Sequence, residues 1–171
     1  MEQQKQKTKI VALGGVMLAL SITTIFLAGL IPGVELTLYA LSSFYTAVII
    51  IETKAGGGWI FYIASCLLSL VMIPNKTALL PYIIFFGIYG LAKYYIEKIR
   101  NQVIEVILKL LFFNSSFGLG IYFFKDLLLG NIHMPDYPQL ILIAGAELMF
   151  LLYDAIFTML IAFYNKRLRR V

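Results

Sequence analysis

The sequence is poor in the residues that carry most enzyme chemistry. It contains one cysteine and one histidine in 171 residues. With Cys66 as its only thiol, the chain has no internal disulfide and no cysteine-based zinc site. H-E-x-x-H and G-x-S-x-G motifs are both missing, so neither zinc-protease nor serine-hydrolase chemistry has its usual residues. We therefore expect no enzymatic activity, no catalytic residues, no metal and no cofactor.

Charge is also scarce, because only 13% of the residues are charged. The chain has 14 basic and nine acidic residues, which gives a net charge of +5. Such a balance can indicate nucleic-acid binding when the basic residues form a patch. Here they gather at the ends of apolar segments, a distribution typical of membrane topology signals. We therefore expect a membrane lipid environment and no nucleic-acid partner.

Apolar residues make up 61% of the chain and form six segments near the length of about 20 residues that a bilayer requires. They predict an all-α fold, a polytopic membrane protein built as a compact six-transmembrane-helix bundle in a single domain over residues 1–171. The first segment is long and lacks a convincing cleavage site, so we expect a transmembrane helix and not a signal peptide. The expected helices are 9–31, 35–51, 58–73, 78–94, 103–124 and 139–164.

Three consecutive glycines, Gly56–Gly58, separate the second and third segments. They predict a flexible connection, and without a following Lys-Ser or Lys-Thr they form no phosphate-binding loop. Pro81 falls in the first turn of the fourth segment, where its missing N–H does no harm.

The basic residues also predict the orientation. If the N-terminus is cytoplasmic, 12 of the 14 basic residues lie on the cytoplasmic side, and only Lys76 and Lys125 lie outside. Because cytoplasmic loops are enriched in Lys and Arg, both termini are expected in the cytoplasm. The expected location is the cell membrane, most naturally the bacterial inner membrane.

The last segment carries two carboxylates, Glu147 and Asp154, seven residues apart and so on one helical face. A charge at mid-membrane depth costs on the order of 3 kcal/mol, so this face must contact protein or a wet cavity. Lys109, on the fifth segment, is expected to form a structural ion pair with Asp154; the alternative is that it extends to the membrane interface.

Glu147 has no assured basic partner and lies beneath the long loop 125–138. It is therefore the best candidate for binding a small molecule, although a hydrogen-bonded structural role is the alternative. Asn114 lies near mid-membrane, where it either joins helices by hydrogen bonds or lines a cavity. An acidic pocket favours a substrate with a cationic or strongly hydrogen-bond-donating group.

Small residues on the first segment, Ala12, Gly15 and Ala19, include a small-xxx-small pair at positions 15 and 19. Such pairs let helix backbones approach closely in lipid. They indicate either packing inside the monomer or a docking surface for another membrane subunit.

The layout and the first segment, KIVALGGVMLALS at Lys9–Ser21, resemble the substrate-binding S components of energy-coupling factor (ECF) transporters. Those proteins carry Ala-xxx-Ala where this chain has Gly15-xxx-Ala19. The resemblance implies vitamin-type micronutrient uptake, with the substrate bound near the outer face. It also implies docking through Ala12, Gly15 and Ala19 onto a transmembrane coupling subunit driven by a pair of ATPases.

In that family the outer loops and the last three helices hold the ligand. The corresponding placements in this chain are Asn75, Tyr82, Asn114, Asn131 and Glu147. Size and helix count are also similar to those of the rod-shape protein MreD. The alternative function is therefore a non-transporting scaffold of a cell-envelope complex.

Overall fold

The computed structural model describes residues 2–99, 101–129 and 139–167, and within these ranges the secondary structure is helical with no strand. Five helices in the described part are long and apolar enough to cross a membrane. This confirms the expected all-α membrane class. The spans are Thr8–Ala28, Glu35–Met72, Thr77–Ile96, Gln102–Gly120 and Ile143–Arg167.

The chain divides into two compact units, Met1–Lys98 and Ile99–Val171, which we call unit 1 and unit 2. Each unit has its own internal packing. The single domain expected from the sequence stays a prediction.

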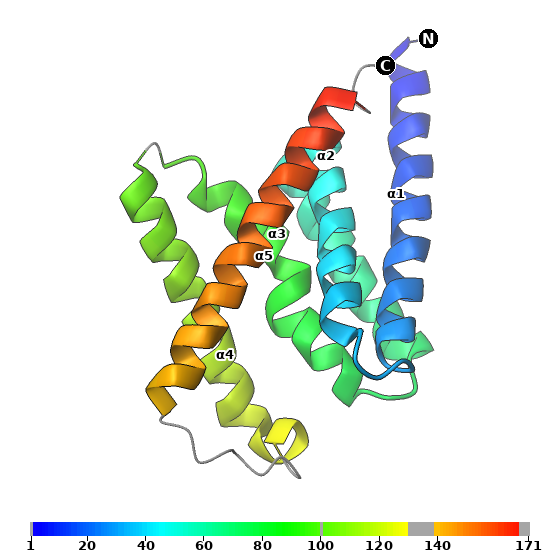
Figure 1. Cartoon of the computed structure of the whole chain (residues 1–171). Helices are drawn as coiled ribbons and strands as arrows, with labels where there is room; N and C mark the ends of the chain where they lie inside the picture. The colour runs from blue at the N-terminus through cyan, green and yellow to red at the C-terminus, as the bar shows by residue number, and fades with distance from the viewer. Residues whose placement is uncertain (1, 100, 130–138, 168–171) are drawn as a thin grey trace. The chain divides into compact units, whose positions relative to one another are not determined.

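Unit 1 contains three α-helices and two short helical turns, and its elements are coloured from blue to green in Figure 1. In chain order they are α1 (Glu2–Ala28), α2 (Glu35–Met72), η1 (Thr77–Leu79), η2 (Tyr82–Phe86) and α3 (Gly87–Ile96). Gly33, with φ of 90°, supplies the left-handed residue in the turn between α1 and α2. Its N–H donates to the Glu35 carboxylate at 2.8 Å.

Helix α2 covers two segments that the sequence predicts as separate helices, 35–51 and 58–73. The predicted glycine connection is wrong in position, because residues 56–58 are helical and the backbone departs from helical geometry at Lys54 (φ 65°, ψ −174°). A Cβ built on Gly58 would lie 2.4 Å from Ile50 Cγ1. Eight residues of straight helix would separate these positions by about 12 Å. The two halves of α2 therefore fold back on each other, as the cyan and teal ribbons show (Figure 1).

The fourth predicted segment, 78–94, is helical but not one regular α-helix. Its start is a 3₁₀ turn, η1, and a π-helical turn, η2, follows Pro81. In η2 the Gly87 N–H donates to the Tyr82 carbonyl, five residues back. The Tyr62 hydroxyl of α2 donates to the Ile83 carbonyl at 2.8 Å, which anchors this turn to α2. Single π turns occur often at functional sites.

The apolar core of unit 1 lies where α1, both halves of α2 and α3 meet. Glycines permit the closest approaches: a Cβ on Gly90 would lie 3.5 Å from the Ala47 backbone nitrogen. The core side chains that are at most 5% exposed include Ile25, Val48, Ile49, Ile50, Phe61 and Leu91.

Unit 2 consists of α4 (Gln102–Leu129) and α5 (Gln139–Arg167). The Asn101 side chain accepts the Val103 N–H at 3.0 Å and so caps the start of α4. Helix α4 continues past the predicted end at 124, so the first residues of the predicted loop 125–138 are helical. Residues 130–138 lie outside the described part of the chain.

Candidate functional site

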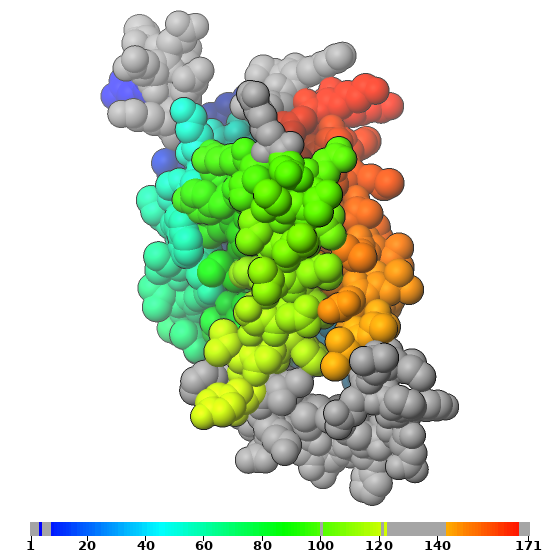
Figure 2. Space-filling view, turned by 90° about the vertical axis from the view of Figure 1, so that its left-hand side faces the viewer, coloured from blue at the N-terminus to red at the C-terminus, as the bar shows by residue number. Residues whose placement is uncertain are grey.

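The polar residues of α4 and α5 face each other and join the two helices. Lys109 Nζ lies 2.9 Å from Asp154 Oδ2, and the two side chains are 4% and 16% exposed. The contact expected from the sequence is thus present, and Lys109 does not extend to an exposed end of α4. Figure 2 shows the yellow-green side chains of α4 beside the orange side chains of α5.

Glu105 adds a second carboxylate to this ion pair. It lies one turn before Lys109 on α4, and its Oε1 is 2.6 Å from the Lys109 ammonium. The side chain of Glu105 is 25% exposed, more than that of Asp154. Two carboxylates therefore share one ammonium, and the more buried one comes from the other helix.

An aromatic contact separates this ionic group from the next polar one. The rings of Phe113 and Phe150 stack with centroids 4.7 Å apart and planes 11° from parallel. The contacts 109–154, 113–150 and 114–147 pair rising numbers on α4 with falling numbers on α5, so the helices are antiparallel here.

The second polar contact brings together two residues expected to bind substrate. Asn114 Nδ2 donates to Glu147 Oε1 at 3.1 Å and to the Leu110 carbonyl at 3.0 Å. Asn114 is exposed and Glu147 is half-buried. Both amide hydrogens of Asn114 are thus used, while its carbonyl oxygen keeps its acceptor capacity, as does the Glu147 carboxylate.

Two acceptor oxygens of this pair, Glu147 Oε2 and Asn114 Oδ1, take no part in the hydrogen bond between the two residues. Within the described residues, the side-chain hydrogen bonds of Asn114 and Glu147 are the one that joins them and the one from Asn114 to the Leu110 carbonyl. A carboxylate oxygen and an amide oxygen at one place suit a ligand group that carries N–H or O–H donors or a positive charge. The substrate chemistry expected from the sequence stays a prediction; the structure shows only that Asn114 and Glu147 are in contact.

The two candidates in unit 1 have different surroundings from each other. Asn75 is exposed, and its Oδ1 accepts the Thr77 N–H at 3.1 Å, which starts η1. Tyr82 is 0% exposed, and its hydroxyl lies 2.6 Å from Ser65 Oγ. The η2 turn thus directs the Tyr82 side chain into the core of unit 1 and not to an exposed surface, and its role in substrate binding stays a prediction. Asn131 lies outside the described residues.

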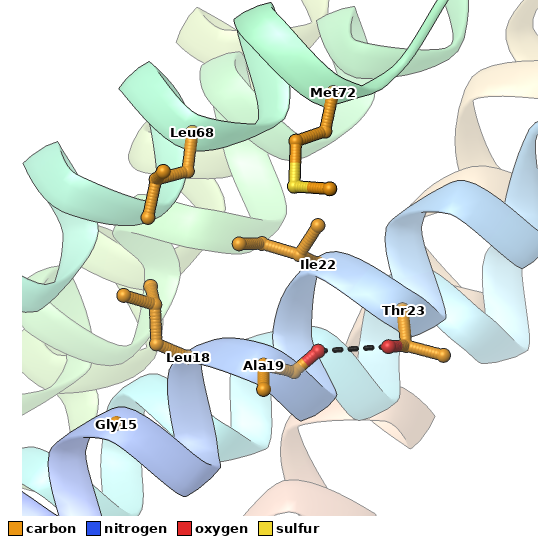
Figure 3. Close-up of a pocket in the computed structure, with 7 residues that line it drawn as sticks. All are labelled: Gly15, Leu18, Ala19, Ile22, Thr23, Leu68 and Met72. Carbon is orange, nitrogen blue, oxygen red and sulfur yellow. Dashed lines mark hydrogen bonds between the residues drawn. The ribbon is translucent and has the colours of Figure 1, made fainter.

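The small residues of α1 line an open groove on unit 1, of about 360 Å³. Figure 3 shows Gly15 and Ala19 on one side of it and Leu68 and Met72 of α2 on the other. The Thr23 hydroxyl, which also lines the groove, donates to the Ala19 carbonyl at 2.9 Å, so its hydrogen bond stays within α1. The groove therefore presents an apolar lining with one small-residue side.

The expected docking residues differ in their relation to this groove. A Cβ built on Gly15 would meet no atom within 4 Å, so close packing against another helix of the monomer does not explain this glycine. Ala12 is exposed one turn before Gly15 but does not line the groove.

Comparison with known proteins identifies no relative. No protein-family model, no curated protein and no solved structure matches this chain.

Proposed function

We propose that this chain is the substrate-binding subunit of a micronutrient uptake transporter in the cell membrane, similar to the S components of ECF transporters. The observation that carries the proposal is the contact between Asn114 and Glu147. It places acceptor oxygens with free capacity on two membrane-spanning segments, where polar groups are costly and usually functional.

The chemistry of the pair defines the substrate class. Glu147 offers a carboxylate and Asn114 an amide oxygen, so the substrate is a small molecule with a cationic or strongly hydrogen-bond-donating group. The Lys109–Asp154 pair, whose ammonium Glu105 also contacts, joins the two helices and takes no part in the proposed binding.

The proposed topology has six membrane crossings and both termini in the cytoplasm. Each half of α2 forms one crossing, since a straight helix of 38 residues would extend about 57 Å, nearly twice the apolar thickness of a bilayer. The reversal at Lys54 then lies on the cytoplasmic side, which agrees with the positive charge of this residue.

The groove beside Gly15 and Ala19 is the proposed surface for a transmembrane coupling subunit, which a pair of ATPases drives. A partner helix with an apolar face would pack against the small residues of α1 and against Leu68 and Met72. ATP-driven transport would require such a partner, because the sequence shows no nucleotide-binding motif and the energy of ATP must then come from another subunit.

The test is native mass spectrometry of the protein purified in a mild detergent, followed by uptake measurements with the molecule found. We expect a small molecule to co-purify with the wild type and to be lost from Glu147→Gln. Ser115→Ala is the matched control, because Ser115 is an exposed neighbour of Asn114 outside the pair. Unchanged binding and uptake in Glu147→Gln would show that the site is wrongly assigned.

Co-purifying proteins distinguish the alternative function. Recovery of two ATPases with a membrane subunit supports transport. Recovery of cell-envelope proteins without ATPases, and without a bound small molecule, would instead favour a non-transporting scaffold similar to MreD.

A further inference from the structure

Two exposed lysines of unit 1, Lys54 and Lys98, lie at the same end of the unit. Lys54 is at the reversal of α2, and Lys98 follows the end of α3. The contacts 58–91, 62–83 and 65–82 pair rising numbers on the second half of α2 with falling numbers on η2 and α3, so these segments are antiparallel. Beyond the contact between Gly58 and Leu91, the two segments therefore continue to Lys54 and Lys98.

The ammonium of Lys98 is held in place by two aromatic rings. Its Nζ lies 4.3 Å from the ring centroid of Tyr94 and 5.3 Å from that of Tyr95. The two rings are 5.5 Å apart and 77° from parallel, so they form a corner that contains the charge. Such cation–π contacts position an ammonium without neutralising it, and it keeps N–H groups to donate.

The positive charge of these lysines is not balanced by nearby carboxylates. Glu97, which precedes Lys98, lies 2.7 Å from the buried ammonium of Lys93. Within the described residues, neither Lys54 nor Lys98 forms an ion pair. The surface therefore favours an anionic ligand, with which an ammonium forms short charge-assisted hydrogen bonds.

The surrounding side chains indicate where this surface lies in the membrane. Trp59 and Tyr95 are 39% and 48% exposed, and tryptophan and tyrosine are enriched at the level of the lipid headgroups. Ile60, beside Trp59, is 72% exposed, as expected for a side chain that contacts lipid chains. The lysines thus lie next to exposed aromatic and apolar groups, a combination that suits a ligand with both an anionic and an apolar part.

We propose that unit 1 binds the headgroup of an anionic phospholipid, with its phosphate held by the ammonium groups of Lys54 and Lys98. The Tyr95 hydroxyl supplies a further donor, and the acyl chains contact Trp59 and Ile60. Inorganic phosphate has the same anionic chemistry, but it would leave these apolar side chains without a partner. The inference is independent of the proposed transport function. The proposed orientation only assigns the lipid to the cytoplasmic leaflet.

The experiment uses Trp59, the single tryptophan of the chain, as a fluorescent reporter beside the site. The full chain is reconstituted in phosphatidylcholine vesicles that contain brominated phosphatidylglycerol or, in parallel, brominated phosphatidylcholine. Bromine quenches tryptophan on contact, so the two titrations give the ratio of the affinities of the two lipids at this site. We expect a ratio of about five or more in favour of phosphatidylglycerol. Equal quenching by the two lipids would overturn the proposal, and this comparison requires no variant.

A double variant, Lys54→Gln with Lys98→Gln, tests the assignment of the lysines. The ratio should fall to about one while the melting temperature confirms a folded protein. An unchanged ratio in the folded variant would exclude these two residues as the site. Lys166→Gln is the control, because it removes the charge of an exposed lysine on α5 and should leave the ratio unchanged. An equal fall in Lys166→Gln would mean that only the general surface charge attracts the lipid, which would overturn a defined site.

Replacing sodium chloride with sodium phosphate at equal ionic strength tests for free phosphate as the ligand. The ratio should stay the same, because the lipid also contacts the apolar side chains. A fall to about one in phosphate would assign the lysines to the free anion and overturn the lipid assignment.

Discussion

The Lys109 ammonium and the Asp154 carboxylate lie 2.9 Å apart and join α4 to α5. Both side chains are largely buried, so each charge depends on the other for its stability in the folded protein. Removing one member of a buried pair leaves the other as an uncompensated buried charge. Replacing both members with apolar residues leaves no buried charge to compensate.

We therefore predict that Lys109→Met lowers the free energy of unfolding by about 3–5 kcal/mol, because Asp154 and Glu105 then lose their shared cation. Adding Asp154→Leu should restore part of this loss. Unfolding in mixed micelles by increasing SDS measures both effects in a double-mutant cycle. Strictly additive losses would contradict the ion pair as the link between the helices.

Glu105→Gln is the control for this cycle. Its carboxylate is more exposed than that of Asp154, and it lies on the same helix as Lys109. Neutralising it should cost about 1 kcal/mol or less, as for an exposed pair on one helix. A loss as large as that of Lys109→Met would mean that Glu105 and not Asp154 is the principal partner.

The ion pair was predictable from the sequence because charges within apolar segments have few possible partners. Lys109 and Asp154 are buried charges of opposite sign, and the apolar pattern places both within membrane spans. The hydrogen bond between Asn114 and Glu147 was not predictable as a contact, although both residues were candidates. Neither charge nor spacing specifies which polar group an amide meets.

Tyr82 shows a different limit of the sequence. Its position near the start of a membrane segment indicates an interfacial tyrosine, which is the common role of tyrosine there. The π-helical turn after Pro81 changes the direction of the side chains, and η2 places Tyr82 in the core beside Ser65. The sequence pattern does not reveal this local shift from α to π hydrogen bonding, so it could not predict that the Tyr82 side chain is buried.

The groove on unit 1 predicts separate effects for two adjacent glycines. Gly15 lines the groove, whereas Gly14 does not, and a Cβ on either would meet no atom within 4 Å. Gly15→Leu should therefore fold and bind ligand normally but lose the coupling subunit, because a large side chain fills the docking surface. Co-purification of partner proteins is the measurement.

Gly14→Leu is the matched control, since it adds the same side chain one residue away. It should keep its partners. Equal loss of partners in both variants would mean that the groove is not the docking surface, and unfolding of Gly15→Leu would mean that Gly15 packs inside the protein.

The close approach within α2 predicts opposite effects for two other glycines. A Cβ on Gly58 would lie 2.4 Å from Ile50 Cγ1 and 3.0 Å from Leu91 Cδ2, so Gly58→Ala overpacks this contact. The expected cost is about 1–3 kcal/mol. Gly56 is helical with no atom within 4 Å of its Cβ position, so Gly56→Ala should be neutral or stabilise by up to about 1 kcal/mol.

Thermal unfolding in detergent compares these two variants. If Gly58→Ala melts no lower than Gly56→Ala, the two halves of α2 are not packed together at this position. The reversal of α2 would then have to lie elsewhere in the helix.

The reversal of α2 depends on the backbone conformation of Lys54. Its φ of 65° with ψ of −174° falls in a region that only glycine adopts readily, and such residues cost about 1–3 kcal/mol. Lys54→Gly and Lys54→Ala both remove the charged side chain. The difference between their stabilities therefore reports the cost of the backbone conformation for a residue with a Cβ. The glycine variant should be the more stable by about 1 kcal/mol or more in thermal unfolding, because glycine adopts this conformation without a Cβ clash. A more stable alanine variant would mean that residue 54 continues the helix, and the fold-back of α2 at this residue would be wrong.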